Sequence, residues 1–412
     1  MAESELQRAI VQGLHPGEDL AAKLYALSGY EIDSPEDAEA VCEALPRFPG
    51  ALHPTEDSFD SPLHALVALF QDVASQEAFD VLSQRGVEEL LRIFDALHAA
   101  PGPKSGDLVF ILKILAMYES AEGISRIVAA ACDPECAEGY LWSVVFGQFD
   151  DGHAYREQLC DELRDPLPVG FARAAYLDFA NQMAIEGDLP DHPFDSPLGK
   201  RHLESWLLSA EPEEYGYGHS AATSVPFMSA PERDQLLALA LDHADPVVQM
   251  EAAWAAVKLG REPGVKFLAR LCLDPHFSKT ACAYLRELDH EDAIPKEAED
   301  EDFQASAEMC NWLSHPSEFG RPPDEIELFD AREIHWPPTE DRRRVWLFRY
   351  CYHAEPGGES DEGIGMVGSI TFAFFGEERR KLTPEDLYAL HCCWELQFND
   401  DPRAPEERSV EA

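Results

Sequence analysis

Residues 245–288 have the sequence DPVVQMEAAWAAVKLGREPGVKFLARLCLDPHFSKTACAYLREL, the clearest indication of architecture in this 412-residue chain. Asp245 and Pro246 form a helix start, because an aspartate side chain accepts a backbone N–H that lacks a helical partner and proline removes only such a donor. Apolar residues then recur every three or four positions until Gly260, as in a helix with one buried face. The Asp-Pro pair returns at residues 274–275. The stretch therefore predicts a helix, a turn, a second helix, a turn and the start of a third helix.

Side-chain sizes on the first two of these helices indicate that they pack closely side by side. Alanines are frequent on the first helix and larger apolar residues line the second; they are Ala252, Ala253, Ala255, Ala256, Val265, Leu268, Leu271 and Cys272. A single helix pair cannot bury such a face alone, so it needs a neighbouring pair on each side. The pattern predicts an α-solenoid.

The same residues match a known repeat pattern: an Asp-Pro pair, a valine, two alanines, a Leu-Gly pair and then a second helix. They are Asp245, Pro246, Val248, Ala252, Ala253, Leu259, Gly260, Val265 and Leu268. The segment resembles a HEAT repeat of the bacterial kind related to the phycobilin-lyase repeats. It departs from the pattern at Gln249, where arginine is common, and at Val257 and Lys258, where Leu-Gly often occurs. The resemblance covers about one and a half repeats and implies a helical-repeat fold, but that scaffold serves binding modules, chaperones and a few enzymes.

One enzyme type with such repeats, the deoxyhypusine hydroxylases, carries His-Glu dyads that hold a di-iron centre. Its family pattern after Asp-Pro is Val-Arg-His-Glu-Ala-Ala, whereas residues 248–253 are VQMEAA, so Met250 occupies the position of the ligand histidine. A thioether does not replace an imidazole in such iron chemistry. The resemblance therefore implies a relative in fold without the metal site, and the sequence predicts no catalytic residue, no cofactor and no metal ligand.

The chain divides by composition into four parts. Residues 1–288 alternate helical patterns with turns that carry proline or glycine, which indicates irregular HEAT-like repeats. Residues 289–304 crowd acidic side chains around Pro295, and because like charges extend a chain, we expect an acidic linker there. We expect a C-terminal module at residues 305–400 and a disordered tail at 401–412.

The C-terminal module is predicted to contain three strands and a helix. Side chains alternate at residues 343–353, which indicates a strand, and the other candidate strands are 325–336 and 364–375. Thr383 begins the final helix. The predicted fold class is mainly α: an irregular HEAT-like α-solenoid followed by a small α+β (βββα) C-terminal module.

An aromatic stripe on the predicted strand 343–353 is the candidate partner-binding surface. It consists of Trp346, Phe348, Tyr350 and Tyr352. Such a stripe either lies exposed, as a platform for a ligand or a partner, or forms the core side of a sheet. In the second case we expect it to pack against Leu390 and Trp394 of the final helix.

Two further patterns in the module have ordinary structural explanations. Residues 363–368 satisfy G-x-G-x-x-G, but an acidic loop precedes them and no helix follows, so we expect a hairpin and not a phosphate-binding turn. His335, His353 and His391 lack the spacing of a zinc signature, and we expect exposed or hydrogen-bonded histidines.

Charge is the most unusual property of the composition. There are 79 acidic residues and only 32 Lys and Arg, which gives a net charge of −47 and a pI of about 4.5. Such a chain is repelled by phosphate backbones and anionic membranes, so we expect neither nucleic acid nor membrane as a partner. A solvated, soluble surface or adaptation to a saline setting explains the charge, and a partner protein with a basic surface is the alternative.

Two functions remain open at this level. The first is a non-catalytic protein–protein interaction scaffold or adaptor built on HEAT-like repeats. The second is an enzyme or cofactor-handling protein, lyase-like or chaperone-like, with its site in the C-terminal module. The ten cysteines are scattered without a CxxC pair and the N-terminus lacks a secretory signal, so we expect a cytoplasmic protein.

Overall fold

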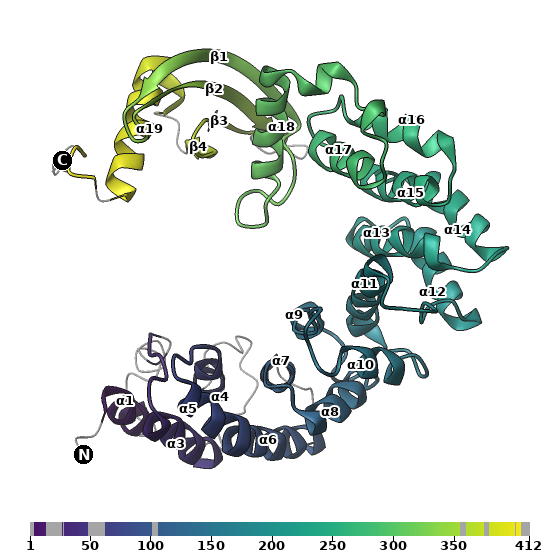
Figure 1. Ribbon diagram of the computed structural model, residues 1–412, viewed down its shortest axis with the longest axis vertical. Helices are drawn as coiled ribbons and strands as arrows, with labels where there is room; N and C mark the ends of the chain where they lie inside the picture. The colour runs from purple at the N-terminus through teal and green to yellow at the C-terminus, as the bar shows by residue number, and fades with distance from the viewer. Residues whose placement is uncertain are drawn as a thin grey trace. The chain divides into compact units, whose positions relative to one another are not determined.

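The computed structural model describes residues 4–13, 27, 29–47, 62–100, 106–354, 360–374, 379–399 and 401–404. The fold is mainly α, with a small α+β part at the C-terminal end, as predicted (Figure 1). The internal contacts divide the chain into two compact units, Met1–His243 and Ala244–Ala412. No described helix is both long and apolar enough to cross a membrane.

In the described part of the first unit, the regular elements are helices. Its described helices are α1 (Glu5–Gly13), α3 (Pro35–Ala44), α4 (Pro62–Ala68), α5 (Gln76–Val81), α6 (Val87–Ala99), α7 (Gly106–Met117), α8 (Ala121–Ala131), α9 (Leu141–Phe146), α10 (Arg156–Glu162), α11 (Gly170–Glu186), α12 (Pro197–Leu207), α13 (Tyr215–Ser224) and α14 (Glu232–Leu241). Helices α7, α9, α11 and α13 contact one another in that order along one row. Helices α8 and α10 contact each other beside that row, as do α12 and α14 (Figure 1). This alternation is that of stacked helix pairs.

The second unit begins with the helices on which the repeat prediction rests, α15 (Pro246–Lys258), α16 (Glu262–Leu271) and α17 (Ser278–Glu287). Asp245 caps α15 as predicted, accepting the Val247 and Val248 N–H groups at 2.8 and 3.2 Å. Gly260 follows the helix with a φ of 71°, a left-handed conformation that glycine adopts without strain. The predicted helix start and helix end are both confirmed.

Close packing of α15 against α16 depends on the small residues. A Cβ on Gly264 would lie 2.6 Å from the Ala253 carbonyl oxygen and 3.0 Å from the Ala256 Cβ. The helices therefore approach with no room for a side chain at this position. This is the role that the sequence indicated for the alanines.

The acidic stretch 289–304 is folded, unlike the extended linker that we expected. It forms two 3-10 turns, Glu291–Ala293 and Lys296–Glu299, and then the start of helix α18 (Glu301–Leu313). Ala298 is buried in the core cluster of α15 to α17, and Ile294 packs against that cluster. The acidic side chains lie on the solvent side of the segment, while its few apolar residues pack against helices α15 to α17.

The sheet of the C-terminal part has four antiparallel strands in the order β1-β2-β3-β4. They are β1 (Glu325–Trp336), β2 (Asp341–Tyr352), β3 (Asp361–Val367) and β4 (Phe372–Phe374). The predicted third strand, 364–375, is divided because the chain bends at residues 368–370 before β4 pairs back onto β3. The hairpin between β1 and β2 turns after Trp336, where Pro337 and Pro338 follow the strand.

A helix covers each face of this sheet. Helix α18 packs on the face that carries Phe348 and Tyr350. Helix α19 (Pro384–Phe398) packs on the opposite face, where Leu390 and Trp394 meet the cluster of Leu347. The expected contact between the aromatic stripe and the final helix is therefore wrong, because α18, which the sequence analysis did not recognise, occupies that face.

Candidate functional site

Most of the aromatic stripe lies inside the protein. Phe348, Tyr350 and Tyr352 have exposed fractions of 0%, 3% and 6% beneath α18. Trp346 is half-buried and donates its Nε1–H to Asp302 at 2.7 Å. The core explanation of the stripe fits this burial, and a partner cannot reach the three buried rings without moving α18.

The three histidines of the module lie in different environments. His335 and His353 are exposed and lie 3.6 Å from Glu340 and 3.3 Å from Glu325, respectively. His391 is buried among aromatic rings, and burial lowers its pKa. None of the three belongs to a group with metal-ligand geometry among the described residues.

The glycines of the G-x-G-x-x-G run lie in and after strand β3. The Tyr350 hydroxyl occupies the space where Gly363 would carry a Cβ, and the Met309 thioether does the same at Gly365. These glycines allow neighbouring side chains to cross the strand, which explains the motif without a phosphate.

A cavity of about 490 Å³ lies on helices α9 and α11 of the first unit. Its apolar part comes from three phenylalanine rings, and its rim holds four carboxylates and one guanidinium; the residues are Phe146, Phe149, Phe179, Asp150, Asp151, Asp178, Glu186 and Arg156. The Phe179 ring lies 5.8 Å from Phe146 and 6.1 Å from Phe149 between centroids, so the three form one cluster. The cavity thus combines an apolar floor with a negative rim.

Asp178 is the most unusual carboxylate of this cavity. Its side chain is in contact with solvent, yet the protein around it displaces enough water to raise the pKa of the carboxyl, while a hydrogen bond to Ser220 and the nearby His219 oppose that rise. Asp178 is one of the residues that line the cavity. It gains from a cation brought beside it, because a cation restores the solvation that the carboxylate lost.

Arg156 holds the opposite side of the cavity in place. Its exposed fraction is 6%, and it donates to Asp188 at 2.6 Å and to Glu186. The Arg156 hydrogen bond is the main reason why the pKa of Glu186 is lowered. Its Nε–H is buried without a hydrogen-bond partner in the described residues. The guanidinium is thus neutralised by its own neighbours, and the rim keeps an excess of negative charge.

A larger cavity, about 870 Å³, lies in the second unit between the loop after α16 and the sheet. The charges in it are paired within the protein: Arg380 lies 2.9 Å from Glu362 and Arg349 lies 3.7 Å from Glu327. Cys351 also faces it.

Cys351 is the residue in this larger cavity that an enzyme would use as a nucleophile. Its Sγ lies 3.8 Å from His353 Nδ1. Burial raises the pKa of the Cys351 thiol, and the neighbouring carboxylates raise it further. An activated cysteine requires a lowered pKa, so this arrangement does not favour nucleophilic catalysis.

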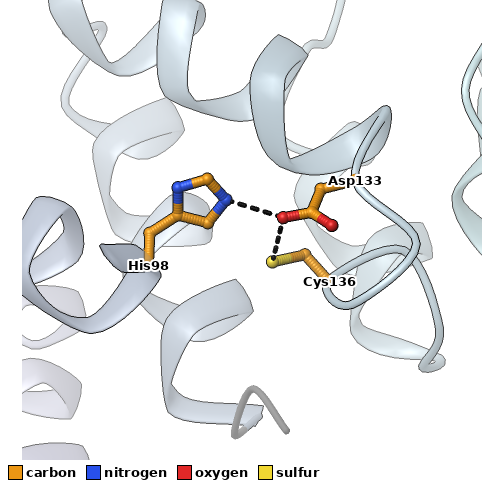
Figure 2. A group of neighbouring side chains, drawn as sticks. All are labelled: His98, Asp133 and Cys136. Carbon is orange, nitrogen blue, oxygen red and sulfur yellow. Dashed lines mark hydrogen bonds and ion pairs between the residues drawn. The ribbon is translucent and has the colours of Figure 1, made fainter. Parts of the chain in front are cut away.

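A third group joins His98, Asp133 and Cys136 in the first unit (Figure 2). His98 Nε2 lies 2.9 Å from Asp133 Oδ2, and the Cys136 thiol donates to the same oxygen at 3.7 Å. The sequence analysis did not find this group. The signal available was a D-x-x-C spacing after α8, but nothing in the sequence indicates that the end of α6 lies beside it.

No family model, no curated protein and no solved structure matches the chain.

Proposed function

We propose that this protein is a non-catalytic interaction scaffold built on HEAT-like repeats, and that its cavity on α9 and α11 binds a basic side chain of a partner protein. The observation that carries the proposal is the pairing of an apolar phenylalanine floor with a negative rim around Asp178. Lysine and arginine side chains have this composition: an apolar stem and a charged end.

Electrostatics support the same partner at longer range. A chain with a net charge of −47 attracts basic proteins and accelerates their encounter at low ionic strength. We propose the cytoplasm as the location, which is supported by ten cysteines that are all free thiols. The alternative, an enzyme with its site in the C-terminal module, has weaker support because Cys351 lacks the lowered pKa of a nucleophile.

The test is a fluorescence titration of the full chain with a labelled arginine-rich peptide. Asp178→Asn removes one charge from the cavity, and Glu157→Gln, which removes one exposed charge from neighbouring α10, is the matched control. We expect Asp178→Asn to weaken binding about 10-fold, the effect of losing one hydrogen-bonded charge pair, and Glu157→Gln to change it less than about 2-fold.

Loss of fold does not explain such a result. Burial raises the pKa of Asp178, which means that folding costs its carboxylate part of its solvation, so the asparagine variant is expected to be at least as stable as the wild type. Equal weakening by both variants would mean that the peptide responds only to net charge, and the proposed cavity would be wrong.

A further inference from the structure

The cluster of His98, Asp133 and Cys136 presents three different metal-ligand atoms to one point. The imidazole nitrogen, the carboxylate oxygen and the thiol sulfur all lie within 4.8 Å of one another. In a tetrahedral zinc site, bonds of about 2.0–2.3 Å place neighbouring ligand atoms roughly 3.3–3.8 Å apart. The Nε2–Oδ2 separation of 2.9 Å is shorter than that range and the Sγ–Oδ2 separation of 3.7 Å lies within it, so small side-chain rotations suffice to admit an ion.

Nucleophilic catalysis is a poor explanation for this cluster. In a cysteine–histidine pair the imidazole contacts the thiol and takes its proton, whereas here the carboxylate of Asp133 lies between His98 and Cys136 and accepts from both (Figure 2). A carboxylate beside a thiol disfavours the thiolate. A divalent cation reverses this effect, since it binds the thiolate and the carboxylate together.

The surrounding structure holds each ligand residue in place. Asp133 Oδ1 accepts the Glu135 N–H at 2.9 Å, which orients the carboxylate. The Cys136 carbonyl accepts the buried Trp142 Nε1–H at 2.9 Å, which fixes the turn. The His98 ring stacks on Phe94 of the same helix, with centroids 5.5 Å apart. Such supporting contacts orient metal ligands in known sites.

The site is also reachable from solvent. The side chains of His98 and Asp133 are 31% and 29% exposed, while Cys136 is buried. Three protein ligands leave a fourth position for water. One thiolate and one carboxylate neutralise a divalent ion, and the neighbouring acidic surface of the chain raises the local cation concentration.

We propose that His98 Nε2, Asp133 Oδ2 and Cys136 Sγ bind one zinc ion, which joins the C-terminal end of α6 to the turn between α8 and α9. The ion acts as a structural clamp within the first unit. Binding releases the proton of the Cys136 thiol to solvent and forms the zinc–sulfur bond, with no redox change.

The experiment uses the full chain, stripped of metal with a chelator and then incubated with zinc alone. We expect one zinc per chain after gel filtration, with a thermal midpoint raised by roughly 5 °C at saturating zinc. Cobalt in place of zinc is expected to give a thiolate-to-cobalt charge-transfer band in the near ultraviolet. Cys136→Ser and His98→Gln should each lower the zinc affinity at least about 10-fold.

Cys132→Ser is the matched control, because this neighbouring thiol contacts Pro166 and lies outside the cluster. It should retain zinc and the cobalt band. Circular dichroism tests whether each variant is folded. If Cys136→Ser does not fold, the zinc affinity of His98→Gln, which changes a partly exposed side chain, tests the proposal. The proposal is overturned if the wild type retains no zinc, or if folded His98→Gln retains as much as the wild type.

Discussion

Three of the Asp-Pro pairs in the chain, those at Asp133, Asp245 and Asp274, behave differently although their residues are the same. In each, the aspartate side chain accepts the N–H two residues later at 2.8–3.0 Å. Only at Asp245 does the following N–H, that of Val248, also reach the side chain; after the other two it bonds to the aspartate backbone carbonyl. An Asp-Pro pair therefore predicts a turn, and it predicts an immediate helix only where the carboxylate holds both N–H groups.

At Arg156 we predict a large loss of stability on substitution. Arg156→Met leaves Glu186 and Asp188 facing each other without their shared cation, and we expect the free energy of unfolding to fall by about 3 kcal/mol. Arg126→Met breaks a partly exposed pair with Asp95 and should cost less than about 1 kcal/mol. Urea unfolding of both variants measures the two losses in free energy of unfolding. Equal losses would contradict the prediction that the buried arginine contributes more than the exposed one.

His192 is predicted to make the first unit sensitive to acid. Burial lowers its pKa from 6.5 to about 3, and its Nδ1 accepts the Phe194 N–H, which requires a neutral ring. Since the unfolded chain takes up this proton first as pH falls, stability is lost below pH 6.5, by about 1.4 kcal/mol per pH unit for one proton.

The measurement for His192 is the pH dependence of unfolding in the wild type and His192→Gln. The difference in free energy between them should shift against the wild type as pH falls from about 7 to about 4.5. Exposed His335→Gln is the control and should leave the pH dependence unchanged. A constant difference between the wild type and His192→Gln would contradict the prediction.

At the scale of single elements, we predict that two glycines respond in opposite ways to alanine. Gly264→Ala places a methyl group against the Ala253 carbonyl of α15 and should destabilise the protein by roughly 1–3 kcal/mol. Gly216→Ala, in α13, meets no atom within 4 Å and should stabilise it by up to about 1 kcal/mol. Thermal unfolding compares them. Two changes of the same sign would contradict the packing argument.

The elements that the sequence predicts well are those whose signal is local. The cap at Asp245, the period of the helix that follows it and the alternation at 343–353 depend on neighbours in the chain, and all three were confirmed. The sequence analysis missed helix α18 because the first turn of this helix is acidic and was assigned to the linker. The sequence analysis also did not predict that α18 packs on the aromatic stripe, since the local sequence does not indicate which helix covers which face of a sheet.

The candidate sites could not be predicted, because their residues come from separated elements. The cluster of His98 and Cys136 joins helix α6 to a turn beyond α8, and the acidic cavity joins α9 to α11. Long-range contact depends on how the helices stack, and the period of each helix does not contain that information.

For the whole molecule, the net charge of −47 predicts a stability that depends on ionic strength. Like charges repel one another in the folded chain, and salt screens that repulsion over about 10 Å at 0.1 M. We expect the thermal midpoint to rise as sodium chloride is added and to rise equally with potassium chloride, since screening does not depend on the cation. A thermal midpoint that stays constant or falls would contradict the prediction, because it would mean that repulsion between like charges does not destabilise the folded chain.

The whole-molecule charge also makes a basic partner attractive anywhere on the surface, so the position of binding is the central question. Hydrogen–deuterium exchange of the full chain with and without an arginine-rich peptide answers it most directly. The account predicts slower exchange in residues 141–186, which include α9 and α11, and little change elsewhere. Slower exchange spread evenly over the chain, or confined to the sheet of the second unit, would contradict it.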